Sequence, residues 1–97
     1  MATTQAGIQN NPVTVSTTAT RLCLNTSRRT LLTFTNNGSV TVYLGGSTVT
    51  STSFLWPLPA GETVQFTGDG GDVSPQMVWY GITASSTASV SVGEVIN

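Results

Sequence analysis

Short stretches in which apolar and polar residues alternate fill most of this chain, and turn-forming residues separate them. From Val13 onward the apolar positions recur at every second residue, as at Val42 and Leu44 or at Val90 and Val92. A period of two is that of a β-strand with one buried face. Glycine, proline, asparagine and serine interrupt the alternation at intervals of roughly 8–12 residues, which is typical of β-sandwiches and barrels.

This pattern predicts an all-β fold: a single antiparallel β-sandwich or jelly-roll-like barrel of about seven or eight short strands. The 97 residues are enough for one domain. Residues 1–12 are polar and end in Asn-Asn-Pro, which is typical of a segment outside a sheet. We therefore expect an extended N-terminal arm over residues 1–12 and a β-sandwich domain over residues 13–97.

Two local patterns in the first half of the chain predict where particular residues lie. Leu22 and Leu24 alternate with Cys23, so we expect the two leucines to share one face and Cys23 to lie on the other. Asn37 and Gly38 form the dipeptide that favours a type I′ turn, because both positions of that turn need a positive φ. We therefore expect a hairpin at this point.

Two further patterns concern the last strands. Tyr80 shares its period-two face with Ile82, so we expect this tyrosine in the core and Trp79 on the opposite face. Gly93 interrupts a valine alternation, which predicts a β-bulge that moves Val95 to the apolar side. Glu94 is then expected on the solvated polar face of this strand.

The residue types that are missing exclude most catalytic chemistry. The chain has no histidine, no lysine and one cysteine, so serine–histidine and cysteine–histidine arrangements cannot form. Cys23 can form no intrachain disulfide, and we interpret it as an inert small apolar residue. The acidic residues are too few and too ordinary in context for a catalytic pair. We expect no enzyme activity, no catalytic residue and no cofactor.

The Asp/Gly loop is a candidate metal-binding site. Asp69 and Asp72 flank two glycines and offer hard oxygen ligands of the kind that Ca²⁺ prefers. Their spacing matches no EF-hand, and two carboxylates alone make a weak site. A glycine-rich surface turn explains the same residues, so we expect no metal.

Charge is the most unusual property of the composition. Charged residues make up 7% of the chain and the formal net charge is −1, against about 25% charged residues in typical soluble domains. So little charge gives little repulsion between copies, which favours self-association. Nucleic-acid binding is disfavoured because the only basic pair is Arg28–Arg29. No signal-peptide pattern and no apolar stretch long enough to cross a bilayer is visible, so we expect synthesis in the cytoplasm and no membrane contact.

A few residues are candidates for contact with a partner. In the arm and the first strand these are Thr3, Thr4, Ile8 and Val13. Arg28 and Arg29 are either a solvated strand end or a contact. Trp79 is the best single candidate for contact with another chain, although the protein's own core or a ligand would also explain it. With Trp56 and Tyr80, Trp79 could instead form a platform on which sugars stack.

Three motifs resemble a family of known proteins. The stretch from Val42 to Thr50 reads VYLGGSTVT, residues 57–62 read PLPAGE, and residues 80–85 read YGITAS before alternating valines and a Glu-Val pair. In these motifs the chain resembles the small β-sandwich structural proteins of tailed-phage virions, among them capsid decoration (cement) proteins. The Asp/Gly loop and residues 1–20 lie outside the resemblance.

The resemblance implies a function. It implies a non-enzymatic virion protein on the capsid surface that stabilises the shell through contacts at subunit junctions. The partner would be the major capsid protein or another virion protein, and the chain would form a homo-oligomer, with a trimer preferred. Two alternatives stay open: an adaptor in the head–tail connector, tail or fibre, and a carbohydrate-binding module that binds a glycan.

Overall fold

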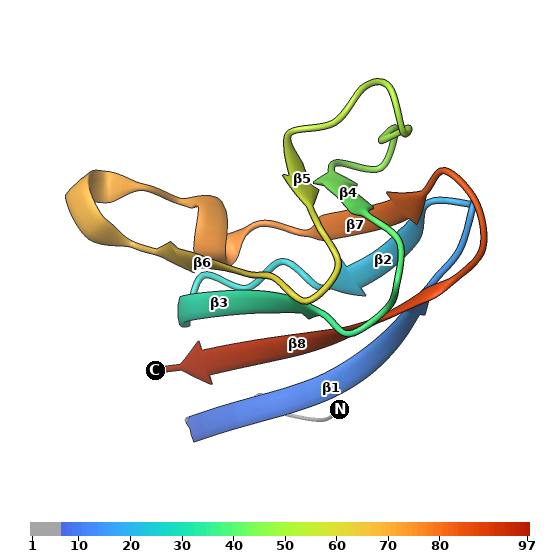
Figure 1. Cartoon of the computed structure of the whole chain (residues 1–97). Coiled ribbons are helices and arrows are strands. Elements are labelled where there is room, and N and C mark those ends of the chain that lie inside the picture. The colour runs from blue at the N-terminus through green and yellow to red at the C-terminus, as the bar shows by residue number, and fades with distance from the viewer. Residues whose placement is uncertain (1–6) are drawn as a thin grey trace, which may run out of the picture.

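Eight β-strands form two antiparallel sheets that pack on one another, as the alternation predicted (Figure 1). The computed structural model describes residues 7–97. Sheet A contains, in spatial order, β1 (Gly7–Val15), β8 (Ala88–Ile96), β3 (Arg29–Asn36) and β6 (Thr63–Thr67). Sheet B contains, in spatial order, β2 (Thr20–Cys23), β7 (Trp79–Thr83), β4 (Val42–Gly45) and β5 (Trp56–Leu58).

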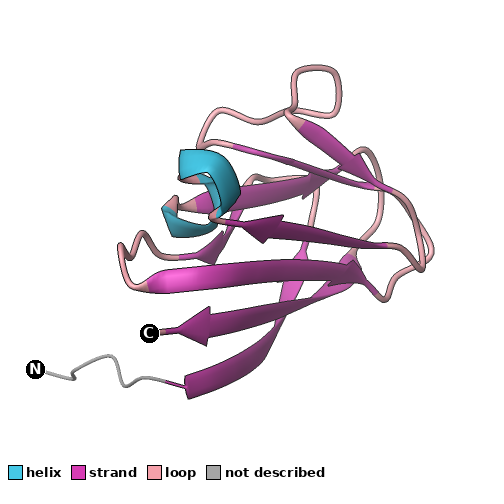
Figure 2. Cartoon of the chain, turned by 90° about the vertical axis from the view of Figure 1, so that its left-hand side faces the viewer, coloured by secondary structure: helices cyan, strands magenta, loops and turns pink. Residues whose placement is uncertain are grey.

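The connection between β6 and β7 carries the helical turns that Figure 2 shows in cyan. They are two short 3₁₀ helices, η1 (Asp69–Gly71) and η2 (Ser74–Gln76). Neither they nor any other helix in residues 7–97 has the length and apolarity to cross a bilayer.

The strand pairing is nested, which makes the fold a jelly roll. β1 pairs with β8, β2 with β7, β3 with β6 and β4 with β5, and additional β3–β8 and β4–β7 ladders complete the sheets. The chain is therefore equivalent to one long hairpin that has been rolled up, the double-sheet arrangement of a jelly roll. The predicted fold class is confirmed.

The core lies between the sheets and is closed at one end by aromatic rings. Leu32 and Phe34 of β3 face Val42 and Leu44 of β4, and none of the four side chains is exposed. The period-two alternation predicted this for Val42 and Leu44. At the end near η2, Trp79 stacks on Phe66 with the ring centroids 4.5 Å apart, and its indole N–H donates to the carbonyl of Ser74 at 2.9 Å.

The predicted orientation of β7 is therefore wrong. Trp79 is 4% exposed and lies in the core, while Tyr80 lies on the outer side of sheet B and is half-buried. Gly81, which follows Tyr80, faces inward among Val42 and Leu22. The indole closes the aromatic end of the core, and this tertiary contact sets the orientation of the strand.

A β-bulge in β2 overturns the expected alternation of Leu22, Cys23 and Leu24. The register of β2 against β7 shifts between Arg21 and Cys23. A bulge places two consecutive residues on similar sides of a strand. Leu22 and Cys23 are consequently both buried, whereas Leu24 is 62% exposed.

The expected bulge at Gly93 is also absent from the pairing. The β1–β8 register is continuous from Gly7 to Val15, and the shift in the β3–β8 ladder lies between Arg29 and Leu31. A Cβ atom at Gly93 would lie 2.5 Å from the hydroxyl oxygen of Thr33, so the Thr33 side chain would have to move to admit one. Strict alternation through Gly93 turns Glu94 inward, on the side of the core, and not toward solvent.

Asn37 and Gly38 form no hairpin, because β3 and β4 belong to different sheets. Gly38 is not among the described glycines with a positive φ. The crossing depends on Asn36, which is fully buried and whose side-chain N–H groups donate to the carbonyls of Val40 and Leu58 at 2.8 and 2.9 Å. This side chain makes the bonds that a turn would otherwise make.

The predicted boundary of the N-terminal arm is too long. Residues 7–12 belong to β1, which pairs with β8 along its whole length. Pro12 is compatible with this assignment because β1 is an edge strand, where a missing N–H can face away from the sheet. Only residues 1–6 of the predicted arm remain, and they lie outside the described residues.

We predict that Gly38→Ala destabilises the fold by about 1–3 kcal/mol, because overpacking a site that cannot relax has this effect. A Cβ at Gly38 would lie 2.5 Å from the Cβ and 2.8 Å from the Cα of Ala88. Gly46→Ala is the matched control, since nothing lies within 4 Å of a Cβ at that position. Urea denaturation measures both. Equal unfolding free energies for the two variants would contradict the prediction.

Candidate functional site

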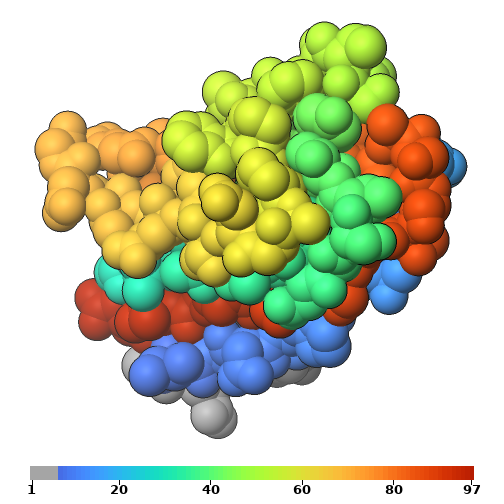
Figure 3. Space-filling model, in the orientation of Figure 1, coloured from blue at the N-terminus to red at the C-terminus, as the bar shows by residue number. Residues whose placement is uncertain are grey.

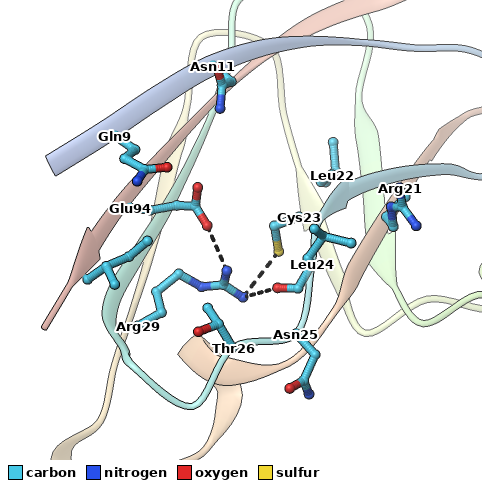
Figure 4. A pocket seen from close by; sticks show the side chains of 11 residues that line it. Gln9, Asn11, Arg21, Leu22, Cys23, Leu24, Asn25, Thr26, Arg29 and Glu94 are labelled. Atoms are coloured by element: carbon cyan, nitrogen blue, oxygen red, sulfur yellow. Dashed lines mark hydrogen bonds and ion pairs between the residues drawn. The ribbon is translucent and has the colours of Figure 1, made fainter. Parts of the chain in front are cut away.

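A hollow lies between β1 and β2, the adjacent edge strands of the two sheets (Figure 4). Its volume is about 400 Å³. We call it the edge cleft. It is lined by Gln9, Asn11, Arg21, Leu22, Cys23, Leu24, Asn25, Thr26, Arg29, Glu94 and Ile96.

The buried side chain of Arg29 forms the floor of the edge cleft. Arg29 is the first residue of β3 and is 1% exposed. One terminal nitrogen donates to the Glu94 carboxylate at 2.6 Å, forming an ion pair (Figure 4). The other terminal nitrogen donates to the carbonyls of Leu24 and Met77, both at 2.8 Å, and Nε donates to the carbonyl of Pro75.

These bonds make Arg29 a structural residue and not a partner contact. Its guanidinium on sheet A connects to the end of β2, to η2 and to the residues that enter β7. A buried charge is tolerated only when it is paired and hydrogen-bonded, and here it is both. The prediction that Arg29 contacts a partner is therefore wrong, as is the expectation that Glu94 lies on a solvated face.

Cys23 borders the same site as a protonated thiol. Burial raises its pKa, and the nearby positive charge of Arg29 only partly opposes this effect. Its Sγ lies 3.5 Å from an Arg29 nitrogen and 3.6 Å from the carbonyl of Met77. Because the thiolate is the nucleophilic form, a raised pKa makes this cysteine unreactive. This agrees with its interpretation as a small apolar residue.

Most of the side chains that line the edge cleft are polar. The Glu94 carboxylate is engaged by Arg29, and the other polar groups are the amides of Gln9, Asn11 and Asn25, the Thr26 hydroxyl and the guanidinium of Arg21. Amides donate and accept hydrogen bonds without changing charge. These side chains offer hydrogen-bond donors and acceptors at the edge of sheet A.

Sequence reasoning missed this site, although a signal for part of it was present. Uninterrupted alternation through Val90 and Val92 would have placed Glu94 on the apolar face. A lone carboxylate on such a face requires a buried cationic partner. Of the three arginines, Arg29 is the buried one. Gln9 and Asn11 fall within residues 1–12, which the sequence pattern predicts to be an arm outside the sheet.

The remaining predicted contact residues are scattered. Ile8 is 82% exposed on β1, while Val13 of the same strand is half-buried against the core. Arg28 is exposed, and its Nε donates to the carbonyl of Asn97 at 2.7 Å. Trp79 is inaccessible in the core, so its predicted contact with another chain is wrong. Thr3 and Thr4 lie outside the described residues.

The three aromatic residues proposed as a sugar platform do not share a surface. Trp56 is paired with Leu44 and so lies on the inner side of β5, where it is 46% exposed at the sheet edge. Tyr80 lies on the outer side of sheet B, and Trp79 is buried. Paired residues across strands face the same side of a sheet, so Trp56 and Tyr80 face opposite sides.

The Asp/Gly loop is held by its own hydrogen bonds. Asp72 accepts bonds from the backbone N–H of Ser74 at 2.9 Å and from its hydroxyl at 2.7 Å, and these bonds lower the pKa of the carboxyl. Asp69 accepts from the hydroxyl of Thr67 at 3.1 Å. Within residues 7–97, no three histidine, cysteine or acidic side chains gather in a way that could hold a metal ion.

Comparison with known proteins gives no relative: the chain matches no protein-family model, no curated protein and no solved structure. The function proposed below therefore depends on the geometry of the described residues and on the motifs of the sequence.

We predict that Arg29→Lys destabilises the fold by about 3 kcal/mol or more. A lysine keeps the charge but lacks the planar fork that reaches Glu94 and several carbonyls at once, so buried acceptors lose their partners. Arg21→Lys is the control, because Arg21 is exposed and its replacement should change the unfolding free energy by less than about 0.5 kcal/mol. Guanidinium denaturation compares the two. A smaller loss in Arg29→Lys than in Arg21→Lys would refute the structural role of Arg29.

We also predict that Cys23 resists alkylation by iodoacetamide at neutral pH in the native protein and reacts readily in denaturant. The raised pKa leaves less thiolate than in an unfolded chain, and burial blocks access. Mass spectrometry follows the added carbamidomethyl group with time. Native labelling at the rate of the denatured chain would show that Cys23 is accessible.

Proposed function

We propose that this chain is a non-enzymatic structural protein of a tailed-phage virion, which binds the outside of a capsid and stabilises the shell. One observation carries the proposal: the outer surface of sheet A has no charged residue on any of its four strands. The strand registers place the same set of side chains on this surface. We call it the neutral face: Ile8, Asn10, Pro12, Thr14, Leu31, Thr33, Thr35, Thr63, Gln65, Thr67, Ser89, Ser91, Gly93 and Val95.

A surface of this kind suits contact with another folded protein. Charged residues are depleted at the centres of protein interfaces, because burying an unpaired charge is costly. On the neutral face, hydroxyl and amide groups can bond to a partner, and Ile8, Leu31 and Val95 provide an apolar corner. Five of the seven charged residues lie elsewhere on the surface, at Arg21, Arg28, Glu62, Asp69 and Asp72.

A second exposed apolar region lies at the end of sheet B. Leu55 is 69% exposed and Met77 is 45% exposed, and the two line one shallow groove. Trp56, next to Leu55, is 46% exposed. Apolar side chains gathered at one end of a small domain favour a site of protein contact. This region and the neutral face would let one copy contact two neighbouring subunits.

The proposed mechanism is stabilisation by binding. A protein that binds the assembled shell and not its dissociated subunits shifts the equilibrium toward the shell. Many copies, each with modest contacts at a junction between subunits, add up to a large total resistance to rupture. No group of the described chain needs to react for this function.

The fold and the motifs support the same proposal by analogy. Jelly rolls are found among viral capsid proteins, although they are also found among lectins, so the fold alone does not decide. The motifs between Val42 and Val95 resemble those of small virion proteins. The sugar-binding alternative is weaker, because its three aromatic residues do not share a surface.

The test is a gradient separation of virus particles, with copies of this protein counted against the major capsid protein by quantitative mass spectrometry. We expect co-sedimentation in numbers of the same order as capsid subunits. Ser89→Glu puts a charge on the neutral face and should lower the copies per particle by about tenfold or more. Ser85→Glu, in the exposed loop before β8, is the matched control and should be incorporated normally.

Other results would replace the proposal. If each particle contains only as many copies as a single ring of subunits would hold, the protein belongs to the connector or tail, which is the second virion role considered for this chain. Protein that stays wholly at the top of the gradient would overturn every virion role. Deletion of residues 1–12 cannot serve as a test, because it removes most of β1.

A further inference from the structure

β1 is the longest of the edge strands in the described residues. β1 is the last strand of sheet A and pairs with β8 alone among the described residues. Figure 3 shows β1 along the lower margin of the described chain, below β8. We propose that β1 pairs with β1 of a second copy of this chain, antiparallel and around a twofold axis at Asn11.

The hydrogen bonds of β8 determine which backbone groups of β1 point to the free edge. The carbonyl of Ser89 accepts the N–H of Asn37 at 2.8 Å, so Ser89 bonds on the side of β3. Thr14, opposite Ser89 in β1, is therefore in a pair without hydrogen bonds to β8. By alternation, the backbone groups that point to the free edge belong to Ile8, Asn10, Pro12 and Thr14.

This assignment explains the position of Pro12. Proline has no N–H and cannot donate to a ladder. Pro12 lies opposite Ser91, which like Ser89 bonds on the side of β3, so β8 needs no donor from it. The β1–β8 ladder is consequently complete, and the backbone donors that remain on the free edge are those of Ile8, Asn10 and Thr14.

β1 has few of the features that normally protect an edge strand. Such strands are usually short, charged, bulged or covered. β1 has nine residues, none of them charged, and its register against β8 is unbroken. Pro12 is its one protective feature, and Ile8 beside the free edge is 82% exposed. A long, uncharged edge of this kind is suited to the addition of another strand.

One register aligns all nine residues of β1 with those of the second copy. It places Gly7 opposite Val15 and Asn11 opposite Asn11 of the other copy. The Asn11 pair is of the kind without backbone hydrogen bonds, in which the Cα atoms approach to about 4.5 Å and the side chains are closest. Two asparagine side chains facing across the axis can exchange amide hydrogen bonds.

The same register uses the free backbone groups. Ile8 lies opposite Thr14 of the second copy, and Asn10 lies opposite its Pro12. Each copy donates the N–H groups of Ile8, Asn10 and Thr14 to the carbonyls across from them. The missing donor of Pro12 removes one bond per copy, and the remaining bonds join the two A sheets into one continuous sheet.

The edge cleft gives an independent reason for this pairing. Gln9 and Asn11 line the cleft from the inner side of sheet A. An added strand extends sheet A beyond β1, so Gln9, Asn11 and Val13 of the second copy lie on the same inner side, over the open side of the cleft. Leu24, which is 62% exposed at the rim of the edge cleft, then lies next to the second copy. The cleft becomes an interior space between two copies, lined by amides from both.

The occupant is a second copy because nothing on this edge repels one. Like charges facing each other across a twofold axis are the usual obstacle to symmetric pairing, and β1 has none. Pairing of the two edges also uses both of them, so assembly stops at a dimer. The result is a dimer and not the trimer that the family resemblance implies.

Sedimentation equilibrium of the purified chain tests the proposal. We expect a mass twice the 10.1 kDa of the single chain. Asn11→Asp and Asn11→Lys should each weaken the dimer by about tenfold or more, because two like charges face each other at the axis. An equimolar mixture of the two variants should dimerise again, because opposite charges then meet. Asn11 is exposed, so circular dichroism should show both variants folded.

Gln65→Glu is the control, since it adds a charge to β6, the opposite edge of sheet A, and should dimerise like the wild type. A wild-type monomer or trimer overturns the proposal, as does dissociation of Gln65→Glu or failure of the mixture to recover. These outcomes are separate from the virion role: a dimer absent from particles refutes only that role, and a monomer present on particles refutes only the pairing.

Discussion

The guanidinium group of Arg29 is the interaction on which the rest of this sandwich depends. It starts on sheet A and bonds to backbone carbonyls at the exit of β2, in η2 and at the entry to β7, while its charge is balanced by Glu94 of β8. Residues near positions 24, 75–77 and 94, three segments well separated in sequence, are thereby held together at one end of the two sheets. Of the three basic residues in the chain, one is therefore buried inside the protein. Arginine suits this position because its planar fork can satisfy several acceptors at fixed angles.

β3 carries a second buried polar residue at its other end. Asn36 is fully buried and connects the start of β4 to β5 through the carbonyls of Val40 and Leu58. Between Arg29 and Asn36, the inward side chains of β3 are apolar. Burial of apolar side chains, which has no preferred direction, therefore stabilises the middle of the sandwich. At its two ends, directional hydrogen bonds fix the position of one sheet relative to the other. The buried side chains of residues 7–97 leave no polar atom without a partner.

The sequence predicted the parts of the fold that period-two burial alone controls. Val42, Leu44, Val90 and Val92 are inside because strict alternation gives them one face. The orientation of β7 could not be predicted in this way, since Trp79 and Tyr80 are both amphipathic and the aromatic contact with Phe66 decides between them. Neither could the bulge in β2, which depends on a register shift against β7. Such choices depend on residues far away in the sequence.

The candidate site was harder to predict for the same reason. Arg29 and Glu94 meet only because β3 and β8 are neighbours in sheet A, and their separation in the sequence hides the pair. Asn36 directly precedes the Asn37–Gly38 pair, which predicts a hairpin because turn preference is a local signal. Its buried side chain serves a crossing between sheets, which no local pattern indicates. Polar residues at structural junctions are where reasoning from short sequence windows fails first.

The nested pairing has a consequence for how the protein is made. Gly7 pairs with Ile96, so the first described strand finds its neighbour only after the last one has left the ribosome. Sheet A cannot be completed in the order of synthesis, and most of its contacts join distant residues, which makes folding slow. Until β8 arrives, β1 and β3 expose unpaired edges with hardly any charge between them. During that interval these edges can pair with other chains, so the incomplete sandwich is prone to aggregate.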